Sequence, residues 1–520
     1  MGVNNNLLTG RFTLKKASLL IFGFCVSALL GACGGGDDDD EVFFSAEYGI
    51  YATDAGANLN IYEDDGKSDI RLVKSIIPKN ANGNPVTELG EIHYAHKMIF
   101  LVIRNGVEID KNDDGNFENI GSGLVMINPQ NDNSVGQIIP LVSDLTGKPS
   151  RAVHTFADPD GKHIWINNDG PSQDGADDSV FRVNWDHMDS DNFGSVKEIL
   201  VGNGHKKSAF AHPHEAKEGT KRLFVTHNLT EQSVSIIDND HMNHDTTMLT
   251  VQQTVDLAKD DVSNTPHGMA FSKVSGRIYT GITSGDDIAV SVIDTTGDLG
   301  AMTTHDILVG TGDKEIPAAG YMKASHDGKE VYTAGYVKHE GEGGHGYFSI
   351  IDAENDDAVK AVIDFGDVAT SSFDIVSMEM DSGMKMKKVY FPSRVPFGPP
   401  NDTVKTNVVN ILNMADIDLT TGKLKDGASI KSMEVGAGPA HRNGPTMNNR
   451  IYYPNGGDCG HDGAASGPGC KEIVVIDMMN DTAPVARFET LGDHPGNIAV
   501  FDIHVLRGHT DAPGGHTGPH

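Results

Sequence analysis

Positively charged residues are scarce in this 520-residue chain. It has 41 lysines and arginines against 73 aspartates and glutamates, so its formal net charge at pH 7 is −32. Nucleic acids and anionic membrane surfaces attract proteins through basic residues, so a chain this acidic is not expected to bind either one electrostatically. The charge fits both a well-solvated surface and the binding of cations, and does not distinguish between them.

Helical periodicity and the common catalytic motifs are also missing. Almost no segment repeats its apolar residues at helical spacing, which argues for an all-β fold. The chain has no nucleophile elbow of the form GxSxG, no phosphate-binding loop after a strand and no HExxH zinc motif. These absences favour a protein that is not an enzyme, although they leave the question open.

Long hydrophobic runs are missing too, apart from one near the N-terminus. Ala17–Leu30 is apolar over fourteen residues and follows a basic stretch, which gives it the length and the flank of a signal-peptide core rather than of a membrane span. The run ends in "LGAC" (30–33), which resembles the bacterial lipobox. The resemblance implies cleavage after residue 32 and a lipid on Cys33. The alternative is a plain secretory signal with a buried cysteine.

The residues after Cys33 predict how the mature chain is anchored. Residues 33–42, "CGGGDDDDEV", are expected to form a flexible Gly/Asp tether. The lipoprotein sorting rule retains aspartate at position two in the inner membrane, and Gly34 stands there instead. We therefore expect an outer-membrane lipoprotein that faces the periplasm or the cell surface and meets the membrane through its lipid.

Cysteine is rare, with four in the whole chain. Besides Cys25 in the expected signal peptide and the lipid-bearing Cys33, only Cys459 and Cys470 remain, and they enclose ten residues. In an oxidising compartment such a pair is expected to form a disulfide. A metal site that combines the cysteines with His461 is the alternative.

Short strand-like segments recur along the rest of the chain, about every 57 residues. Each is an apolar run that ends at or near Asp or Asn, as in "LVMIN" (124–128), "FRVNW" (181–185), "VSIID" (234–238), "VSVID" (290–294), "FSIID" (348–352), "MADID" (414–418) and "IVVID" (473–477). Glycine- and aspartate-rich turns separate them from further β-rich runs. A repeat of this length fits one four-stranded blade of a β-propeller.

The two ends of the repeat predict how the propeller closes. Residues 493–505 open a unit that the chain does not finish, and residues 48–53 and 58–63 look like its missing strands. Pairing of the first and last strands would remove two exposed sheet edges. We therefore predict a single β-propeller over residues 43–508, in which the N-terminal strands complete the C-terminal blade. Eight blades are favoured and seven are the alternative.

The blade sequences resemble the YVTN/lactonase-like propeller superfamily, above all at "TPHGMAFSKVSGRIYTG" (265–281). The resemblance covers nearly the whole mature chain. It implies the fold and leaves the function open, because propellers carry unrelated activities.

Histidines recur at one place in the blades, eleven or twelve residues before the aromatic residue of the next strand. This place is held by His154, His212, His267 and His441, with Tyr321 in the same position, and His93 and His494 begin further innermost strands. Equivalent positions would form a ring, and imidazole nitrogens bind Zn²⁺ or Cu²⁺. His214 shares a strand face with His212 and could reach the same ion. The alternative is that each imidazole bonds to backbone where its blade begins.

Two propeller families make metal binding concrete. The chain resembles the periplasmic zinc metallochaperone of zinc importers in its export, its propeller repeat and its histidine-rich segments. It lacks the tight histidine cluster of that family at the mature N-terminus. It lacks, too, the cupredoxin segment that accompanies the copper propeller of nitrous oxide reductase.

The function favoured by the sequence is therefore binding of a transition metal, zinc rather than copper, for delivery or buffering. A periplasmic metal-binding protein would be the partner. The alternatives are a metal-dependent lactonase-like hydrolase and a non-catalytic surface scaffold.

Two other segments could hold cations. "DKNDDGNFENIG" (110–121) resembles an EF-hand loop through Asp110, Asn112, Asp114 and Asn116, but it has Gly121 where the loop needs a bidentate glutamate. A structural Ca²⁺ is one interpretation and an ordinary Asx-rich turn is the other. The histidine-rich residues 509–520 are expected to be a flexible tail.

Anchoring through Cys33 can be tested directly. Cys33→Ala removes the thiol that carries the lipid, so the variant should leave the membrane fraction or accumulate as an uncut precursor. Fractionation of cells followed by immunoblotting measures this. A variant that stays as membrane-bound as the parent would disprove the lipobox interpretation.

Overall fold

Strands in the middle of each sheet are buried almost along their whole length, whereas outer strands alternate between exposed and more buried residues. β10 (Ser179–Asn184) and β14 (Ser233–Asp238) are buried at every residue except the last. β15 (Val251–Asp256), by contrast, alternates between partly buried and exposed residues. A strand is buried on both faces only when its sheet is packed between two other layers. The burial pattern therefore reflects sheets that are stacked face to face.

The computed structural model describes part of the chain, and all of this part belongs to the unit Ser45–His520. The described residues are 46–67, 69–95, 97–112, 114–145, 148–158, 162–169, 178–185, 192–211, 223–228, 230–238, 249–257, 266–282, 290–296, 302–307, 318–338, 344–366, 369–370, 372–379, 385–395, 406–436, 446–447, 449–455, 471–492 and 495–506.

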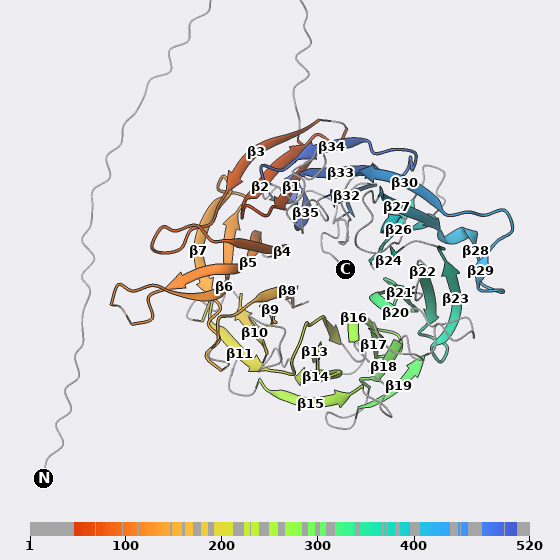
Figure 1. Ribbon diagram of the computed structural model, residues 1–520, viewed down its shortest axis with the longest axis horizontal. Coiled ribbons are helices and arrows are strands. Elements are labelled where there is room, and N and C mark those ends of the chain that lie inside the picture. The colour runs from red at the N-terminus through yellow and green to blue at the C-terminus, as the bar shows by residue number, and fades with distance from the viewer. Residues whose placement is uncertain are drawn as a thin grey trace, which may run out of the picture. The chain divides into compact units, whose positions relative to one another are not determined.

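Seven four-stranded antiparallel sheets follow one another around the ring (Figure 1). From the innermost strand outward they are β35 (Ile498–Asp502), β1 (Tyr48–Thr53), β2 (Leu59–Asp64) and β3 (Ile70–Ile76); β4 (Glu88–Ala95), β5 (Met98–Ile109), β6 (Glu118–Asn128) and β7 (Ser134–Pro140); β8 (Ala152–Ala157), β9 (His163–Asn168), β10 and β11 (Val196–Leu200); β12 (Ser208–Ala211), β13 (Leu223–Asn228), β14 and β15; β16 (Pro266–Ser272), β17 (Arg277–Ile282), β18 (Val290–Asp294) and β19 (Thr303–Ile307); β20 (Ala318–Ala324), β21 (Glu330–Lys338), β22 (Gly344–Asp352) and β23 (Ala358–Asp364); and β31 (Thr446–Met447), β32 (Arg450–Asn455), β33 (Glu472–Asp477) and β34 (Ala486–Glu489).

Between β20–β23 and β31–β34 lies a five-stranded sheet with a different inner edge. It contains β24 (Ala369–Thr370), β25 (Asp374–Glu379), β26 (Lys385–Val395), β27 (Thr406–Asn413) and β30 (Lys431–Gly436). β24 and β25 both pair with β26, so the innermost position is divided between two strands. A small hairpin, β28 (Ile417–Asp418) and β29 (Lys423–Leu424), follows the 3₁₀ turn Met414–Asp416 and is inserted before β30.

The expectation of eight four-stranded blades is therefore wrong. Seven sheets have the regular four-stranded pattern, which is the number that the sequence offered as its alternative, and the sheet of residues 369–436 departs from it. The expected number of blades comes from the number of apolar runs in the sequence. Such runs do not show how strands pair at the inner edge of a sheet, and the division between β24 and β25 depends on that pairing.

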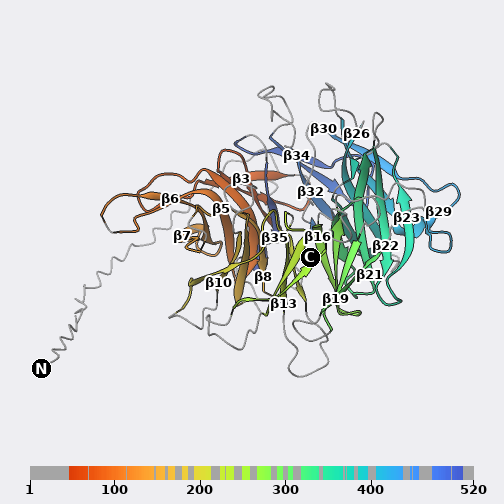
Figure 2. The same cartoon turned by 60° about the horizontal axis from the view of Figure 1, so that its bottom comes forward.

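The ring closes through the N-terminal strands, as the sequence predicts. β35 pairs with β1 in antiparallel register, from Tyr48 opposite Asp502 to Ala52 opposite Ile498. The short helix α1 (Ile503–Leu506) follows β35 directly. Figure 2 shows the same sheets turned by 60°. The innermost strands β12, β16 and β20 contact one another in chain order. Among the described residues, no helix is long and apolar enough to cross a bilayer.

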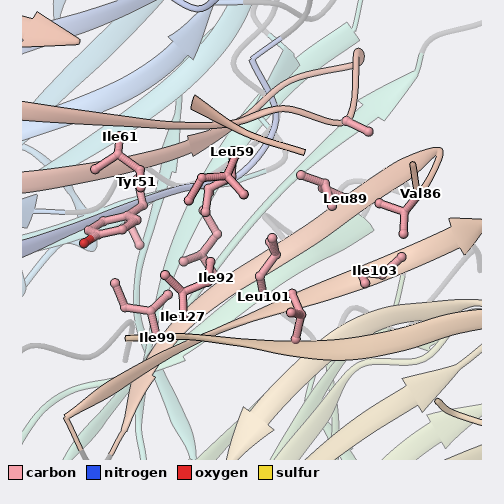
Figure 3. Close-up of a cluster of buried hydrophobic side chains, with 14 of the residues drawn as sticks. Tyr51, Leu59, Ile61, Val86, Leu89, Ile92, Ile99, Leu101, Ile103 and Ile127 are labelled. Atoms are coloured by element: carbon pink, nitrogen blue, oxygen red, sulfur yellow. The ribbon is translucent and has the colours of Figure 1, made fainter. Parts of the chain in front are cut away.

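Apolar side chains fill the space between neighbouring sheets. Figure 3 shows such a cluster, in which Tyr51 and Leu59 of the first sheet pack against Ile99 and Leu101 of the second. Leu59, Ile99 and Leu101 are completely buried. Since burial of one such side chain contributes about 1.5–3 kcal/mol, these interfaces are the main stabilising contribution of the ring.

Polar contacts of one recurring type join neighbouring sheets. In each, a second strand carries a cation and, two residues later, a tyrosine. Both side chains contact one aspartate, which lies at the end of the third strand of the next sheet or in the turn after it. The three cases are Arg277 and Tyr279 with Asp357, Lys388 and Tyr390 with Asp481, and Arg450 and Tyr452 with Asp64. We call them inter-sheet clasps.

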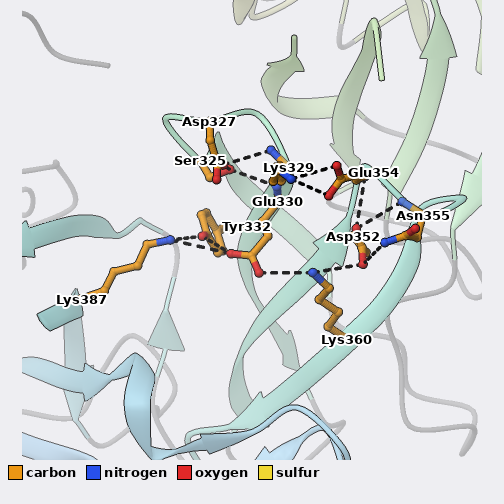
Figure 4. A network of polar contacts seen from close by, with 10 residues as sticks. All are labelled: Ser325, Asp327, Lys329, Glu330, Tyr332, Asp352, Glu354, Asn355, Lys360 and Lys387. Carbon is orange, nitrogen blue, oxygen red and sulfur yellow. Dashed lines mark hydrogen bonds and ion pairs between the residues drawn. The ribbon is translucent and has the colours of Figure 1, made fainter. Parts of the chain in front are cut away.

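The seam between β21 and β26 uses the opposite arrangement of charge (Figure 4). Here Glu330 takes the place of the cation two residues before Tyr332, and the cation, Lys387, comes from the next sheet. Lys360 lies 3.4 Å from Glu330 and 3.0 Å from Asp352, which completes the network. Like the clasps, this interface contains a charge pair and a tyrosine. Here the sheet with the tyrosine supplies the anion and the next sheet supplies the cation.

The clasp at Asp64 joins the two ends of the chain, so it offers a test of ring closure. Arg450 Nη1 donates to both oxygens of Asp64 at 3.0 Å, and Tyr452 Oη donates at 2.8 Å. Asp64→Ala leaves the buried guanidinium without its carboxylate, so the free energy of unfolding should fall by about 3–5 kcal/mol. Denaturant unfolding followed by circular dichroism measures the change.

The matched control is the exposed pair of Lys329 and Glu354, whose side chains are 49% and 45% exposed. Glu354→Ala should lower the free energy of unfolding much less than Asp64→Ala does, because water screens the pair. Equal losses in the two variants would contradict the role of the clasp.

Candidate functional site

Three of the histidines predicted to form a ring are described, each on an innermost strand. They are His93 in β4, His154 in β8 and His267 in β16. The other predicted ligands His212, His214, His441 and His494 lie outside the described residues, as do Cys33, Cys459, Cys470 and the tail 509–520. Their metal-binding, lipid-bearing or disulfide roles stay predictions.

Strand pairing gives a second measure of the equivalent position in the β8, β4 and β12 sheets. His154 lies two residues before Phe156, which pairs with Trp165 of the second strand. By the same measure Glu91 precedes His93, which pairs with Phe100. The ring position in the β4 sheet therefore belongs to Glu91, and His93 lies beside it.

The same measure applied to β12 corrects the place of the HPH segment. Phe210 pairs with Phe224, so the residue two before it, Ser208, holds the position that counting assigned to His212. β12 ends at Ala211, so His212 and His214 follow the innermost strand in the sequence instead of opening it. Counting failed here because the connection between the first and second strands is longer in this sheet than in the others.

Four rings lie in series along the inner wall. The ring centroids of His154 and His205 are 5.2 Å apart, those of His205 and His267 are 5.5 Å apart, and those of His267 and Tyr321 are 5.4 Å apart. His205 is not among the predicted site residues, because it lies in the connection before β12 and not on a strand. The signal that could have found it is the polar segment "GHKKS" directly before an innermost strand.

Glu91 joins the β4 and β8 sheets through a hydrogen-bond network. Its Oε1 lies 2.7 Å from His154 Nδ1, and its Oε2 accepts from the backbone N–H of Thr155 at 2.7 Å and from Thr155 Oγ1 at 2.9 Å. His93 Nε2 lies 3.4 Å from the same Oε2 and contacts Thr155 Oγ1. Both oxygens of this carboxylate are therefore engaged, and the groups around it are hydrogen-bond donors.

These contacts set the protonation of Glu91 and His154. Burial by itself raises the pKa of Glu91, but the hydrogen bonds and charges of His154 and His93 outweigh it and hold this pKa well below its usual range. For His154, burial and the nearby charge of Lys207 lower the pKa to about 4, against the opposing effect of Glu91. His154 is therefore a neutral imidazole at pH 7 that donates from Nδ1 to an ionised Glu91.

Asp169 and His205 form a second carboxylate–imidazole pair. His205 Nδ1 lies 2.6 Å from Asp169 Oδ2, and the side chains are 24% and 6% exposed. Burial by itself raises the pKa of Asp169, but the hydrogen bond and charge of His205 and the charge of Lys206 bring the net shift below the usual value. A buried, ionised carboxylate thus holds one nitrogen of a ring that solvent reaches.

The other side of the inner wall has a third ionic group. Lys323 Nζ lies 3.0 Å from Asp374 Oδ1, and Tyr453 Oη donates to Asp374 Oδ2 at 3.3 Å. Lys323 comes two residues after Tyr321 on β20, so this group continues the series of rings. The neighbourhood of Asp374, where the sequence found no histidine, carries a carboxylate instead.

Among the residues that the structure describes, no group of three or more histidine, cysteine, aspartate and glutamate side chains is arranged to hold a metal ion. The Nδ1 atoms of His154 and His205 each face a carboxylate oxygen. The metal that the lactonase-like resemblance implies therefore does not fit the described residues.

The loop that resembles an EF-hand closes on itself. Asp110 Oδ1 accepts from the N–H groups of Asn112 at 3.3 Å and Asp114 at 3.1 Å, and its Oδ2 accepts from Gly115 at 2.7 Å. Asn116 donates its own N–H to Asp114. These bonds are those of an Asx-rich turn, and calcium binding stays a prediction.

The low pKa of His154 gives a test of this geometry. The unfolded chain has a histidine pKa of about 6.5, so as the pH falls the unfolded state takes up this proton before the folded state does. The contribution of His154 to stability is complete above pH 6.5 and is lost as the pH falls from about 6.5 to 4. An NMR titration should show His154 with a midpoint near 4.

Lys207→Met serves as the comparison, because removal of its charge should raise the midpoint of His154. His154→Gln should remove part of the loss of stability between pH 6.5 and 4. A midpoint at or above 6.5 for His154 in the folded protein would contradict the described burial.

No protein-family model matches the chain, and no curated protein sequence matches it significantly. Solved structures resemble it weakly. The periplasmic gluconolactonase of Pseudomonas aeruginosa has a TM-score of 0.41 and 14% identity, over 75% of this chain and 97% of its own. A putative 6-phosphogluconolactonase from Bacteroides uniformis has a TM-score of 0.40 and 12% identity, over 78% and 100%. The β-propeller domain of Cps50 (Swd1) from Myceliophteria thermophila has 0.37 and 8%, over 69% and 98%. At these values no activity or residue role is carried over.

Proposed function

We propose that the protein is a hydrolase that opens a lactone or another carboxylic ester at the inner wall of its propeller, with His205 as the general base. It differs from the metal-dependent lactonase-like hydrolase that the sequence offered as an alternative to metal delivery, because it uses no metal. It rests on one observation above the others, the pairing of His205 with the buried Asp169.

The pairing has the geometry that a general base needs. A carboxylate at 2.6 Å from Nδ1 holds the ring in the tautomer with its proton on Nδ1, which leaves Nε2 as the proton acceptor. The 24% exposure of His205 gives water and a substrate access to the ring, whereas Asp169 stays buried and ionised. A base held by a third group in this way is typical of hydrolytic sites.

The proposed step is the addition of water to the ester carbonyl. Water oxygen forms a bond to the carbonyl carbon while one of its protons passes to His205 Nε2. The bond between that carbon and the ring oxygen of the lactone then breaks, and the leaving oxygen takes the proton from His205. The product is a hydroxy acid, and the imidazole returns to its neutral state.

Lys207 supplies a positive charge on the same segment. It lies two residues after His205, and its Nζ is 3.4 Å from His154 Nδ1 and 5.4 Å from the centroid of the Tyr321 ring. A cation at the inner wall would stabilise the negative charge that develops on the carbonyl oxygen. Glu91 and His154 would then keep this part of the wall ordered, since both carboxylate oxygens are already engaged.

Metal delivery or buffering remains a separate proposal that depends on histidines outside the described residues. It is supported by the sequence phase of His441 and by the residue type of His212, His214 and His441. The two functions differ in what they require, because hydrolysis needs the Asp169–His205 pair and metal delivery does not. The outer-membrane anchor through Cys33 is proposed on the lipobox alone.

Hydrolysis is tested by turnover of a panel of γ- and δ-lactones and simple esters, followed by proton release. His205→Gln should lower kcat/KM by about 10²-fold or more, because the general base is lost while the surrounding side chains stay in place. Asp169→Asn should lower it less, because the imidazole remains and only its orientation is lost. Each protein is assayed after dialysis against a chelator and again with added zinc.

The matched control is His305 on the outer strand β19, another histidine paired with an aspartate. Its Nε2 lies 3.0 Å from Asp357 Oδ2. His305→Gln should keep full activity. Absence of turnover across the panel in the wild-type protein, or equal rates in wild type and His205→Gln, would overturn the proposal. Activity that depends on zinc and is indifferent to His205 would favour the metal-dependent alternative.

A further inference from the structure

Residues 203–208 connect the third sheet to the fourth. From His205 to Ser208 their side chains alternate between the inner wall and the protein interior. His205 and Lys207 belong to the ring contacts of the inner wall, through His154, His267 and Tyr321. Lys206 is completely buried, and Ser208 is 7% exposed. Lys206, between the two functional side chains, and Ser208, directly after them, therefore anchor the segment inside the protein.

Lys206 is the central anchor. Its Nζ lies 2.9 Å from Asp178 Oδ2 and donates to the carbonyl of Gly204 at 2.7 Å. Asp178 Oδ2 also accepts the N–H of Gly204 at 2.7 Å, and the N–H of Asp178 donates to Asn203 Oδ1 at 3.1 Å. Asp178, directly before β10, thus holds the connection at three residues, two of them through its carboxylate and one through its backbone N–H.

Neighbouring groups complete the fixation. Asn167 Nδ2 donates to the carbonyl of Lys206 at 3.2 Å, and Ser208 Oγ donates to Asn167 Oδ1 at 3.0 Å. Gly204 has φ of +99°, and a Cβ there would lie 2.4 Å from the backbone nitrogen of Thr230. The segment can therefore take this path only with glycine at 204, and both sheets restrict its position.

A buried ion pair contributes little stability compared with an apolar pair of similar volume, because both charges lose their water. Its geometry, however, is directional, since the ammonium must face the carboxylate and the carbonyl together. Such a pair is therefore better suited to fixing the path of a connection than to strengthening the fold. The side chains whose direction depends on this path are His205 and Lys207.

We propose that Lys206, through its pair with Asp178, is a positioning residue that directs His205 and Lys207 into the site of hydrolysis. The inference rests on the proposed function for its catalytic consequence. Lys206 does not reach the inner wall itself, and it acts by holding the backbone on both sides of the two functional residues. Small displacements of a base from its productive geometry are costly to the rate.

The experiment uses two variants of the full chain. Lys206→Met removes the ammonium and leaves Asp178 unpaired, so this variant is expected to be destabilised. The double change Lys206→Met with Asp178→Leu replaces the pair by apolar side chains and should melt close to wild type. Its kcat should fall roughly tenfold or more while KM changes by less than about threefold, because orientation is lost and the binding surface is kept.

A second readout is independent of turnover. The ¹⁵N and ¹H signals of the His205 ring report its tautomer and its hydrogen bond to Asp169, and they should shift in the double variant. The matched control is the pair of Lys388 and Asp481, also buried, with side chains 9% and 4% exposed. Lys388→Met with Asp481→Leu should change the melting temperature and leave both kcat and the His205 signals as in wild type.

The outcomes separate the two proposals. Unchanged His205 signals in a well-folded Lys206→Met, Asp178→Leu variant overturn the positioning role, whether or not the wild type turns over a lactone. Wild-type kcat in that variant overturns it as well. Shifted signals in a protein that hydrolyses no member of the panel support the positioning of His205 and reject the hydrolase.

Discussion

The pairing of β1 with β35 is the interaction on which the rest of this structure depends. Each middle strand of the ring is buried because its sheet has a neighbour on both faces, and the sheets at the two ends of the chain have that only when the ring is closed. Closure joins residues that lie about 450 positions apart, so it is costly in chain entropy. The clasp of Arg450 and Tyr452 on Asp64 strengthens the same junction with buried polar contacts.

Closure also determines the chemistry of the inner wall. The innermost strands are brought into a circle, and side chains from different sheets become neighbours: Glu91 with His154, His205 with His267, and Lys323 with Asp374. The carboxylates of Glu91, Asp169 and Asp374 each contact an imidazole or a lysine. Although the protein is strongly acidic, its inner wall therefore contains ordered imidazoles and at least two lysines, Lys207 and Lys323. Carboxylates that hold imidazoles in one tautomer are suited to proton transfer, which is the basis of the proposed hydrolysis.

Sequence reasoning located the strands well and the site in part. Apolar runs and turn residues predict the third strands of six sheets, but "MADID" (414–418) forms the 3₁₀ turn and β28 instead of the third strand β27. Residues 48–53 are predicted to complete the last blade because a propeller removes its edges by closing. Counting from second-strand aromatics correctly found His154 and His267 on innermost strands. It did not find Glu91, whose equivalence with His154 appears only when strand pairing is known, and it did not find His205, which lies on no strand.

Apolar periodicity and turn residues in the amino-acid sequence are enough to predict short antiparallel strands and the pairing of the first strands with the last. These properties follow from local turn chemistry and from apolar periodicity, which neighbouring residues carry. Tertiary structure alone decided the division of β24 and β25, the seven regular sheets, and the meeting of Asp169 with His205. The last of these depends on Lys206 and Asp178, residues 28 positions apart whose charges can be buried only against each other, and no local pattern encodes that contact.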